Sequence, residues 1–353
     1  MDHSFRRQAV HPVQGGCMDI SIILLALGLL LAFVMSMNLG GNDAANPTSA
    51  AIGSGVLTLK RALVFFSIFV FLGAVLQGSM VMKTIGKGIV PEIDIVGAFA
   101  IILSANIWIF AATMRGMAIS TTHSIICAVI GYGLVEFGLG GINLGVLGTI
   151  VLSWIASPLC SVALAYLFFK MIDSYADRNE EAKIQKFFSY LLIGSLCFSA
   201  YSFGANDVAN ATGVYVTIAS QMGHIPDSLA MVELAVFGTI GIILGAVLFG
   251  PKVIRTLAFR VTRLDLPTGL AASLSNAMVV YLFTTVPYIL FGYGLPISTS
   301  YAAVGAILGA SIAAKKKLSK NTSVYLISYW LITVPANILL SGAVVYLLKM
   351  LMV

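Results

Sequence analysis

The sequence has 353 residues, of which 59% are hydrophobic and only 10% are charged, and its mean hydropathy is +0.99. Soluble domains carry roughly 25% charged residues, so 20 Lys and Arg with 14 Asp and Glu cannot cover a water-facing surface of this size. Composition therefore excludes a soluble α/β enzyme, a disordered chain and a disulfide scaffold, and it predicts an all-α polytopic membrane protein. The formal net charge of +6 is explained by basic loops that face anionic lipid, so no nucleic-acid partner is expected.

Residues 1–18 are polar and are predicted to be an N-terminal tail. Ten apolar segments follow, which we expect to form a multi-pass protein of the inner or plasma membrane, in contact with the lipid bilayer. They cover residues 20–57, 62–82, 93–113, 118–137, 142–169, 187–219, 228–249, 268–291, 297–314 and 322–348. The first and sixth segments are longer than the roughly 20 residues of one straight crossing and contain Gly, Asn and Asp, so a broken helix is expected in each. The fourth and ninth are short and begin with polar residues, so they either span or enter the membrane partway.

The Lys and Arg residues predict how these segments are oriented. If the N-terminus lies outside and each segment crosses once, most basic residues fall in inside loops, including those at 252–263 and 315–320. Cytoplasmic loops of membrane proteins carry such an excess. We therefore predict that both termini lie outside and that the highly charged stretch 171–186 is a cytoplasmic linker.

Two similar halves, residues 19–170 and 187–353, lie on either side of this linker. Three motifs recur in the same order: GGNDAANP at 40–47 and GANDVANA at 204–211, LGAVLQG at 72–78 and LGAVLFG at 244–250, AISTTHS at 118–124 and PISTSYA at 296–302. Each half has five predicted crossings, and an odd number means that the second half enters the membrane upside down. The sequence thus predicts two inverted-topology repeats, with broken and half helices that meet near the membrane midplane, as in secondary transporters.

The first polar motif is Asn42-Asp43-x-x-Asn46, and its copy is Asn206-Asp207-x-x-Asn210. Glycines before each motif would let the backbone unwind and expose carbonyl oxygens, which suit a hard cation such as Na+ together with carboxylate and amide oxygens. An ionised Asp deep in a membrane is costly unless it is paired, and neither segment contains Lys or Arg. We therefore predict sodium sites at Asn42, Asp43, Asn206 and Asp207, with a transported proton as the alternative partner. The simpler explanation is that these side chains cap or bridge helices.

The second polar motif is Ser120-Thr121-Thr122, with its copy Ser298-Thr299-Ser300, and each begins a short apolar helix. Hydroxyls, free backbone N–H groups and the helix dipole together make an anion site without a formal charge, although Ser and Thr are also ordinary N-caps. Phosphate keeps protons that an Asp can accept, and sulfate at neutral pH does not, so phosphate is favoured. The predicted phosphate-binding residues are Asp43, Asn46, Ser120, Thr121, Thr122, Asp207, Asn210, Ser298, Thr299 and Ser300.

These motifs closely resemble those of the inorganic phosphate transporter (PiT) family of cation-coupled phosphate symporters, over nearly the whole chain from about residue 19. The resemblance implies an all-helical, inverted-repeat transporter that is a homodimer and moves inorganic phosphate inward with Na+ or H+. We favour Na+ as the coupling ion and expect no other cofactor. The second hydroxyl motif departs from the first, since Tyr301 stands where the first copy has His123.

Two other classes of protein compete with the transporter. An anion channel would also suit symmetric broken helices, but it does not need paired Asp residues that face the ligand. A membrane-embedded hydrolase would need a nucleophile with a base, and the adjacency of His123 and Ser124 in the sequence does not make a triad. A symporter of another tetrahedral oxyanion such as sulfate is the remaining alternative. No enzymatic activity is expected.

Overall fold

The computed structural model describes residues 15–82, 88–176, 180–221, 228–292 and 294–352, and every regular element in these ranges is helical. The main helices are α1 (Gly15–Asp43), α2 (Ala45–Gly53), α3 (Leu59–Gln77), α5 (Ile95–Met114), α6 (Thr121–Phe137), α7 (Leu144–Ala176), α8 (Glu181–Gln221), α9 (Ser228–Leu248), α10 (Gly250–Phe259), α11 (Leu266–Phe291), α12 (Thr299–Ala313) and α13 (Lys320–Met352). Most of the predicted tail lies outside the described residues, and α1 begins slightly before the predicted start of the first repeat.

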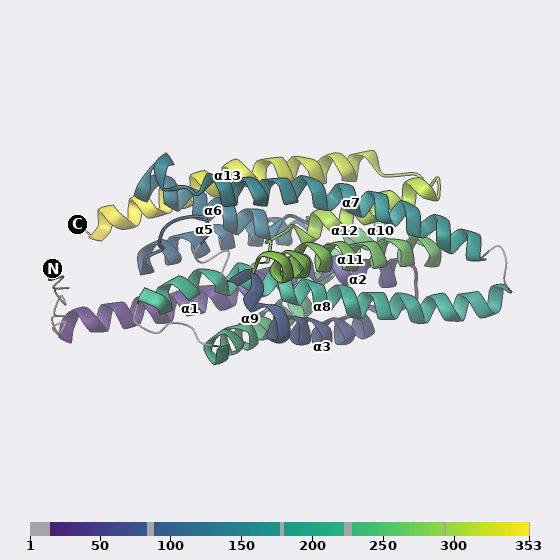
Figure 1. Ribbon diagram of the computed structural model, residues 1–353, viewed down its shortest axis with the longest axis horizontal. Coiled ribbons are helices and arrows are strands. Elements are labelled where there is room, and N and C mark those ends of the chain that lie inside the picture. The colour runs from purple at the N-terminus through teal and green to yellow at the C-terminus, as the bar shows by residue number, and fades with distance from the viewer. Residues whose placement is uncertain (1–14, 83–87, 177–179, 222–227, 293, 353) are drawn as a thin grey trace, which may run out of the picture.

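The helices run mainly along the long axis of the molecule (Figure 1). The start of α1 and the end of α13 lie at one end of this axis, and the end of α7 and the start of α8 lie at the other, so α1 and α8 enter the bundle from opposite ends (Figure 1). Within the described residues, seven helices are long and apolar enough to cross a membrane: α3, α5, α7, α8, α9, α11 and α13. The prediction of an all-helical, multi-pass membrane protein is confirmed.

Helices α6 and α12 are too short to cross a bilayer in a straight line. They have 17 and 15 residues, and at 1.5 Å per residue the shorter one covers about 22 Å of a hydrocarbon core that is about 30 Å thick. Residues 117–120 and 294–298, which belong to no helix, lead into them. Each is therefore a half helix whose N-terminus begins inside the protein.

The first and sixth apolar segments, which are the two long ones, differ in their helix structure at the Asn-Asp motif. The expected break in the first segment is confirmed, because α1 ends at Asp43 and α2 begins at Ala45. Pro47 in α2 has no N–H group to donate to the Asp43 carbonyl, so the helix cannot continue undisturbed. The expected break in the second segment is wrong, since α8 is continuous through Asp207. Ala211 stands where the first copy has Pro47 and keeps its N–H group.

Glycines near these motifs serve close helix packing, and the expectation that they unwind the backbone is wrong, because Gly40 and Gly204 lie inside helices. A Cβ atom on Gly40 would lie 1.8 Å from the Ile242 carbonyl oxygen, and one on Gly204 would lie 2.1 Å from the Val70 carbonyl oxygen. Gly245 and Gly73, the glycines of the repeated LGAVL motif, meet the backbones of α1 and α8 in the same way. Each motif thus lies against a helix of the other half.

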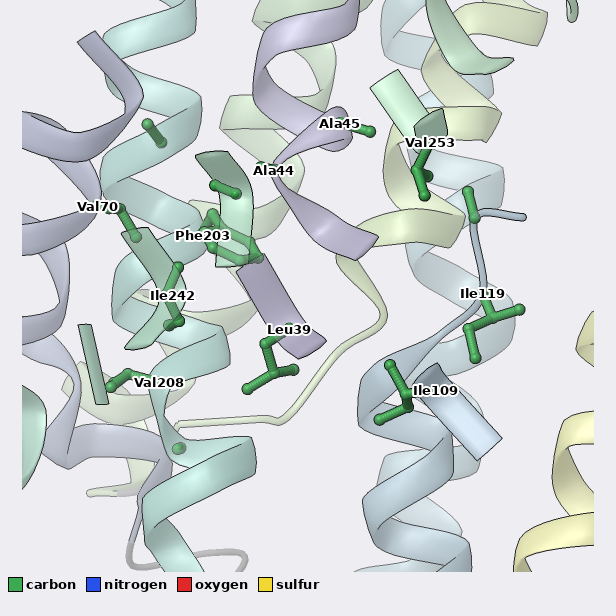
Figure 2. Packing of buried hydrophobic residues seen from close by; sticks show 14 of the residues in the cluster. Leu39, Ala44, Ala45, Val70, Ile109, Ile119, Phe203, Val208, Ile242 and Val253 are labelled. Atoms are coloured by element: carbon green, nitrogen blue, oxygen red, sulfur yellow. The ribbon is translucent and has the colours of Figure 1, made fainter. Parts of the chain in front are cut away.

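Equivalent helices of the two halves have equivalent packing partners. Helix α1 packs on α9 as α8 packs on α3, and α13 packs on α5 and α6 as α7 packs on α11 and α12. The halves are therefore interlocked, because α7 of the first half lies on α11 and α12 of the second, and α13 of the second half lies on α5 and α6 of the first. Buried side chains from both halves, including Leu39, Val70, Phe203 and Ile242, gather in the shared core (Figure 2).

Candidate functional site

The four polar motifs meet in the interior, where the break between α1 and α2 and the middle of α8 face the N-termini of α6 and α12. All ten predicted phosphate-binding residues are buried, with at most 5% of any residue exposed. Residues that are far apart in the sequence are in direct contact, as with Asn46 and Ser300. The structure therefore brings the two Asn-Asp motifs and the two hydroxyl motifs into one site.

Asp43 is held by hydroxyl groups from both half helices. Its Oδ2 atom accepts a hydrogen bond of 2.6 Å from Thr121 of the same half, and its Oδ1 atom accepts one of 2.7 Å from Ser300 of the other half. The Asn46 amide donates to Asp43 Oδ1 at 3.2 Å and to Thr299 and Ser300 at 3.2 and 3.1 Å. Both oxygens of the Asp43 carboxyl group therefore accept hydrogen bonds from the protein.

Asp207 lies in the equivalent place but makes fewer hydrogen bonds. The Asn210 amide donates to Asp207 Oδ1 at 2.9 Å and to Thr122 at 3.0 Å. Thr122 and Thr299 lie beside Asp207, but its Oδ2 atom has no hydrogen-bond partner among the described residues. The two carboxyl groups are close enough to interact electrostatically, and the ion pairs in the described residues lie elsewhere.

Four buried oxygen atoms around this site accept no hydrogen bond from the described residues: Oδ1 of Asn46, Asn206 and Asn210, and Oδ2 of Asp207. Buried polar atoms are nearly always paired, so a group of unpaired acceptors in one place calls for an explanation. Oxygen acceptors of this kind can coordinate a hard cation or accept a hydrogen bond from a protonated oxyanion. These four oxygen atoms are therefore suited to coordinate Na+ and to accept a hydrogen bond from a protonated anion.

Asn42 and Asn206 hold the non-helical segments that precede the half helices in place. The Asn42 amide donates to Thr113 at 2.9 Å and to the Met117 carbonyl at 2.8 Å, and its Oδ1 atom accepts from the Ile119 N–H at 3.0 Å. Asn206 donates to Thr284 at 2.8 Å and to the Leu295 carbonyl at 3.1 Å. Their assignment as sodium ligands stays a prediction. The Oδ1 atom of Asn206 is unpaired among the described residues and is free to coordinate Na+. The Oδ1 atom of Asn42 already accepts a hydrogen bond from the Ile119 N–H and would have to bind Na+ as well.

Ser120 and Ser298 are the N-caps of α6 and α12. Each side chain accepts a hydrogen bond from the backbone N–H three residues on, at 3.1 Å for Ser120 and 3.2 Å for Ser298. The Ser120 hydroxyl also hydrogen-bonds to Nδ1 of His123. The capping function weighed in the sequence thus applies to the first serine of each motif, and the next two hydroxyls face the Asp residues. Phosphate contacts from the two serines stay a prediction.

A stack of four aromatic rings lies directly behind the hydroxyl motifs. The ring centroid of His123 lies 3.6 Å from that of Trp154 and 4.5 Å from that of Tyr301, and Tyr301 lies 4.0 Å from Trp330. The stack joins α6 to α12 and continues to α7 and α13. Sequence reasoning missed it, although Trp154 and Trp330 hold the same position in their helices and His123 and Tyr301 are equivalent in the two repeats. The stack ties the two half-helix starts together.

Comparisons with known proteins show what this chain is similar to. The family model described as "Phosphate transporter family" matches residues 39–341. A protein of Pyrococcus furiosus with the name "Putative phosphate permease" is 29% identical, covering 93% of this chain and 97% of that protein. One of the same name from Haemophilus influenzae is 27% identical, covering 92% and 97%. A solved structure described as "The sodium-dependent phosphate transporter" superposes with a TM-score of 0.81 at 27% identity, covering 93% of this chain and 99% of that chain.

Proposed function

Because the chain belongs to the phosphate transporter family, we propose that it is a secondary transporter that carries inorganic phosphate across the inner or plasma membrane together with Na+. The family and the structural neighbour are transporters, so the chain is a transport protein and not an enzyme. The proposal of Na+ rests on the group of unpaired buried oxygens around Asp207 and on the sodium dependence by which the structural neighbour is named. A proton is the alternative coupling ion.

In this proposal the half helices hold the anion. The backbone N–H groups at the starts of α6 and α12 and the Thr299 hydroxyl would donate to phosphate oxygens. Thr121 and Ser300 donate their single hydroxyl hydrogen to Asp43, and Thr122 donates its own to the Ile297 carbonyl. These three hydroxyls would have to turn toward phosphate when it binds. Sodium ions would lie against the Asp43 and Asp207 carboxylates and would compensate two buried charges that have no basic partner among the described residues. Each ligand therefore lowers the cost of binding the other, which is the condition for coupled transport.

Coupling can be tested with the purified protein in liposomes, where the Na+ and pH gradients are set separately. An inward Na+ gradient is expected to drive phosphate to an internal concentration above the external one, and a pH gradient alone is not. An anion channel would only equilibrate phosphate, because a pore cannot accumulate its solute. Accumulation that needs the pH gradient and ignores Na+ would instead assign a proton as the coupling ion.

Competition in the same liposomes tests the choice of anion. Arsenate is expected to compete with phosphate, and sulfate is not. Near neutral pH, phosphate and arsenate keep a proton that Asp43 or Asp207 can accept in a hydrogen bond, whereas sulfate has none. Inhibition by sulfate at the concentration at which arsenate inhibits would favour a general tetrahedral-oxyanion symporter.

The orientation and the assembly are also proposals. The basic loops favour both termini outside and the α7–α8 and α12–α13 loops inside, and the family resemblance favours a homodimer. A Lys317→Cys variant is expected to react with a membrane-impermeant thiol reagent only after the cells are opened, with Leu139→Cys in the α6–α7 loop as the outside control. All four cysteines of the sequence, Cys17, Cys127, Cys160 and Cys197, would first be replaced. Labelling of position 317 in intact cells would reverse the assignment.

A further inference from the structure

A basic cavity of about 570 Å³ lies between the loop that joins α10 to α11 and the loop that joins α12 to α13. Four of its lining residues are basic: Arg260, Arg263, Lys316 and Lys317. The cavity lies apart from the phosphate site, because α12 has the site at its N-terminus and the cavity beyond its C-terminus. The transport site does not use these residues.

The walls of this cavity are fixed by hydrogen bonds between the two loops. The Ser319 N–H donates to the Val261 carbonyl at 3.1 Å, and the Thr262 hydroxyl donates to the Lys317 carbonyl at 3.2 Å. Lys316 donates to the Arg263 carbonyl at 2.9 Å. The basic residues are thus held on a built frame and not on two independent loops.

One of the four cations is neutralised and three are not. Lys316 forms an ion pair of 2.7 Å with Asp265. Partial burial disfavours the charged form of Asp265, but the hydrogen bonds from Lys316 and Thr268 outweigh this effect and lower the pKa of its carboxyl group. Arg260, Arg263 and Lys317 are exposed, and none of them has an ion-pair partner among the described residues. The cavity therefore has a net positive charge.

The cavity also has an apolar side. Phe259 and Leu318 line it, and Phe259 is 56% exposed at the end of α10. The opposite face of α10 is buried against the protein through residues such as Val253, Ile254 and Leu257. A ligand that fits would carry an anionic group next to apolar chains, which is the chemistry of an anionic phospholipid. A free phosphate ester shares the anionic group but would leave Phe259 in water.

We propose that this cavity binds the phosphate group of an anionic phospholipid, with the start of the acyl chains against Phe259. Basic pockets between helices on the cytoplasmic side of membrane proteins take anionic lipid headgroups in this way. The bound lipid would fix the loop that follows α12 and so anchor the end of a half helix whose other end holds Thr299 and Ser300.

The test uses the full chain purified in neutral detergent and phosphatidylglycerol as the probe, with lipid retained on the protein measured by native mass spectrometry. The triple variant Arg260→Gln, Arg263→Gln, Lys317→Gln is expected to lower the apparent affinity for phosphatidylglycerol by roughly 10- to 100-fold, since each basic residue near an anionic lipid surface contributes severalfold. Phosphatidylcholine is expected to bind both proteins equally and weakly. Thermal unfolding of the variant in phosphatidylcholine checks that it is folded.

A matched control removes three other exposed basic residues of the same predicted side: Lys60→Gln, Arg61→Gln and Lys186→Gln. It is expected to retain phosphatidylglycerol like the parent. Equal loss in the control, or normal retention in the cavity variant, would overturn the proposal. A separate arm adds sn-glycerol 3-phosphate, which is not expected to displace the lipid at millimolar concentration. Full displacement by this soluble ester would reject the lipid as the ligand and assign the cavity to a solute.

Discussion

Replacing Asp207 with Asn is expected to lower Na+-driven phosphate uptake roughly 30- to 150-fold, because removal of a charge-assisted contact costs about 2–3 kcal/mol. The Asp207 Oδ2 atom has no partner in the described part of the chain, so the protein itself loses few contacts when the charge is removed. The hydroxyls of α6 and α12 remain, so the loss should appear mainly as lost Na+ dependence. Thermal stability without ligands should change little, since a neutral amide is less costly in a membrane than a bare carboxylate.

Asp43→Asn is expected to lower uptake by a similar factor but also to reduce stability. Asp43 accepts hydrogen bonds from Thr121, Ser300 and Asn46, and an amide cannot accept from all three. Hydrogen bonds to a charged group contribute about 1.5–3 kcal/mol each. The two variants therefore separate coupling from folding: both should lose coupling, and Asp43→Asn should also melt at a lower temperature.

Glu233→Gln is the matched control for both variants, because Glu233 is an acidic residue of the span α9 that is exposed and lies outside the site. It is expected to transport like the parent. Uptake and melting temperature would be measured with and without Na+ and phosphate. If Asp207→Asn folds, accumulates phosphate and responds to Na+ like the parent, the aspartates are not the coupling site.

Replacing Gly204 with Ala is expected to destabilise the protein by about 1–3 kcal/mol or more, because the added methyl group forces two helix backbones apart. The new Cβ atom would lie 2.1 Å from the Val70 carbonyl oxygen and 2.9 Å from the Ala74 nitrogen. Neither atom belongs to a flexible side chain, so α3 and α8 must separate. Gly73→Ala, on the opposite side of the same contact, is expected to have the same effect, with 1.9 Å to the Tyr201 carbonyl oxygen.

Gly194→Ala in the same helix should have the opposite effect on stability. Gly194 is exposed, and a Cβ atom there would meet no described atom within 4 Å. Ala is favoured over Gly inside a helix by roughly 0.5–1 kcal/mol, so this variant should be as stable as the parent or slightly more so. Thermal unfolding of all three variants in one detergent provides the measurement. Equal stability of Gly204→Ala and Gly194→Ala would show that the close approach of α3 and α8 does not limit stability.

The sequence by itself determined the class of protein and pointed to the four polar motifs that the structure brings together. Composition settles the membrane class, because too few charges are present to cover a soluble surface. Polar residues that recur in apolar segments are costly to keep, so the two Asn-Asp motifs and the two hydroxyl motifs indicate a site from the order of the amino acids alone. The half helices could be predicted as well, since α6 and α12 are short and start with Ser and Thr.

Only the tertiary structure decided what each of these residues contacts. Repeats read along the chain show that Asn46 and Asn210 are alike, but not that Asn46 contacts Ser300 of the other half. From the sequence, Gly40 and Gly204 were expected to let the helix backbone unwind. The structure shows that they let two helices approach closely, because the backbone of another helix lies against each of them. The same limit explains why the ring stack of Trp154, His123, Tyr301 and Trp330 was missed. A sequence pattern records local propensity and symmetry, whereas the partners of a buried group are fixed by packing between segments far apart in the chain.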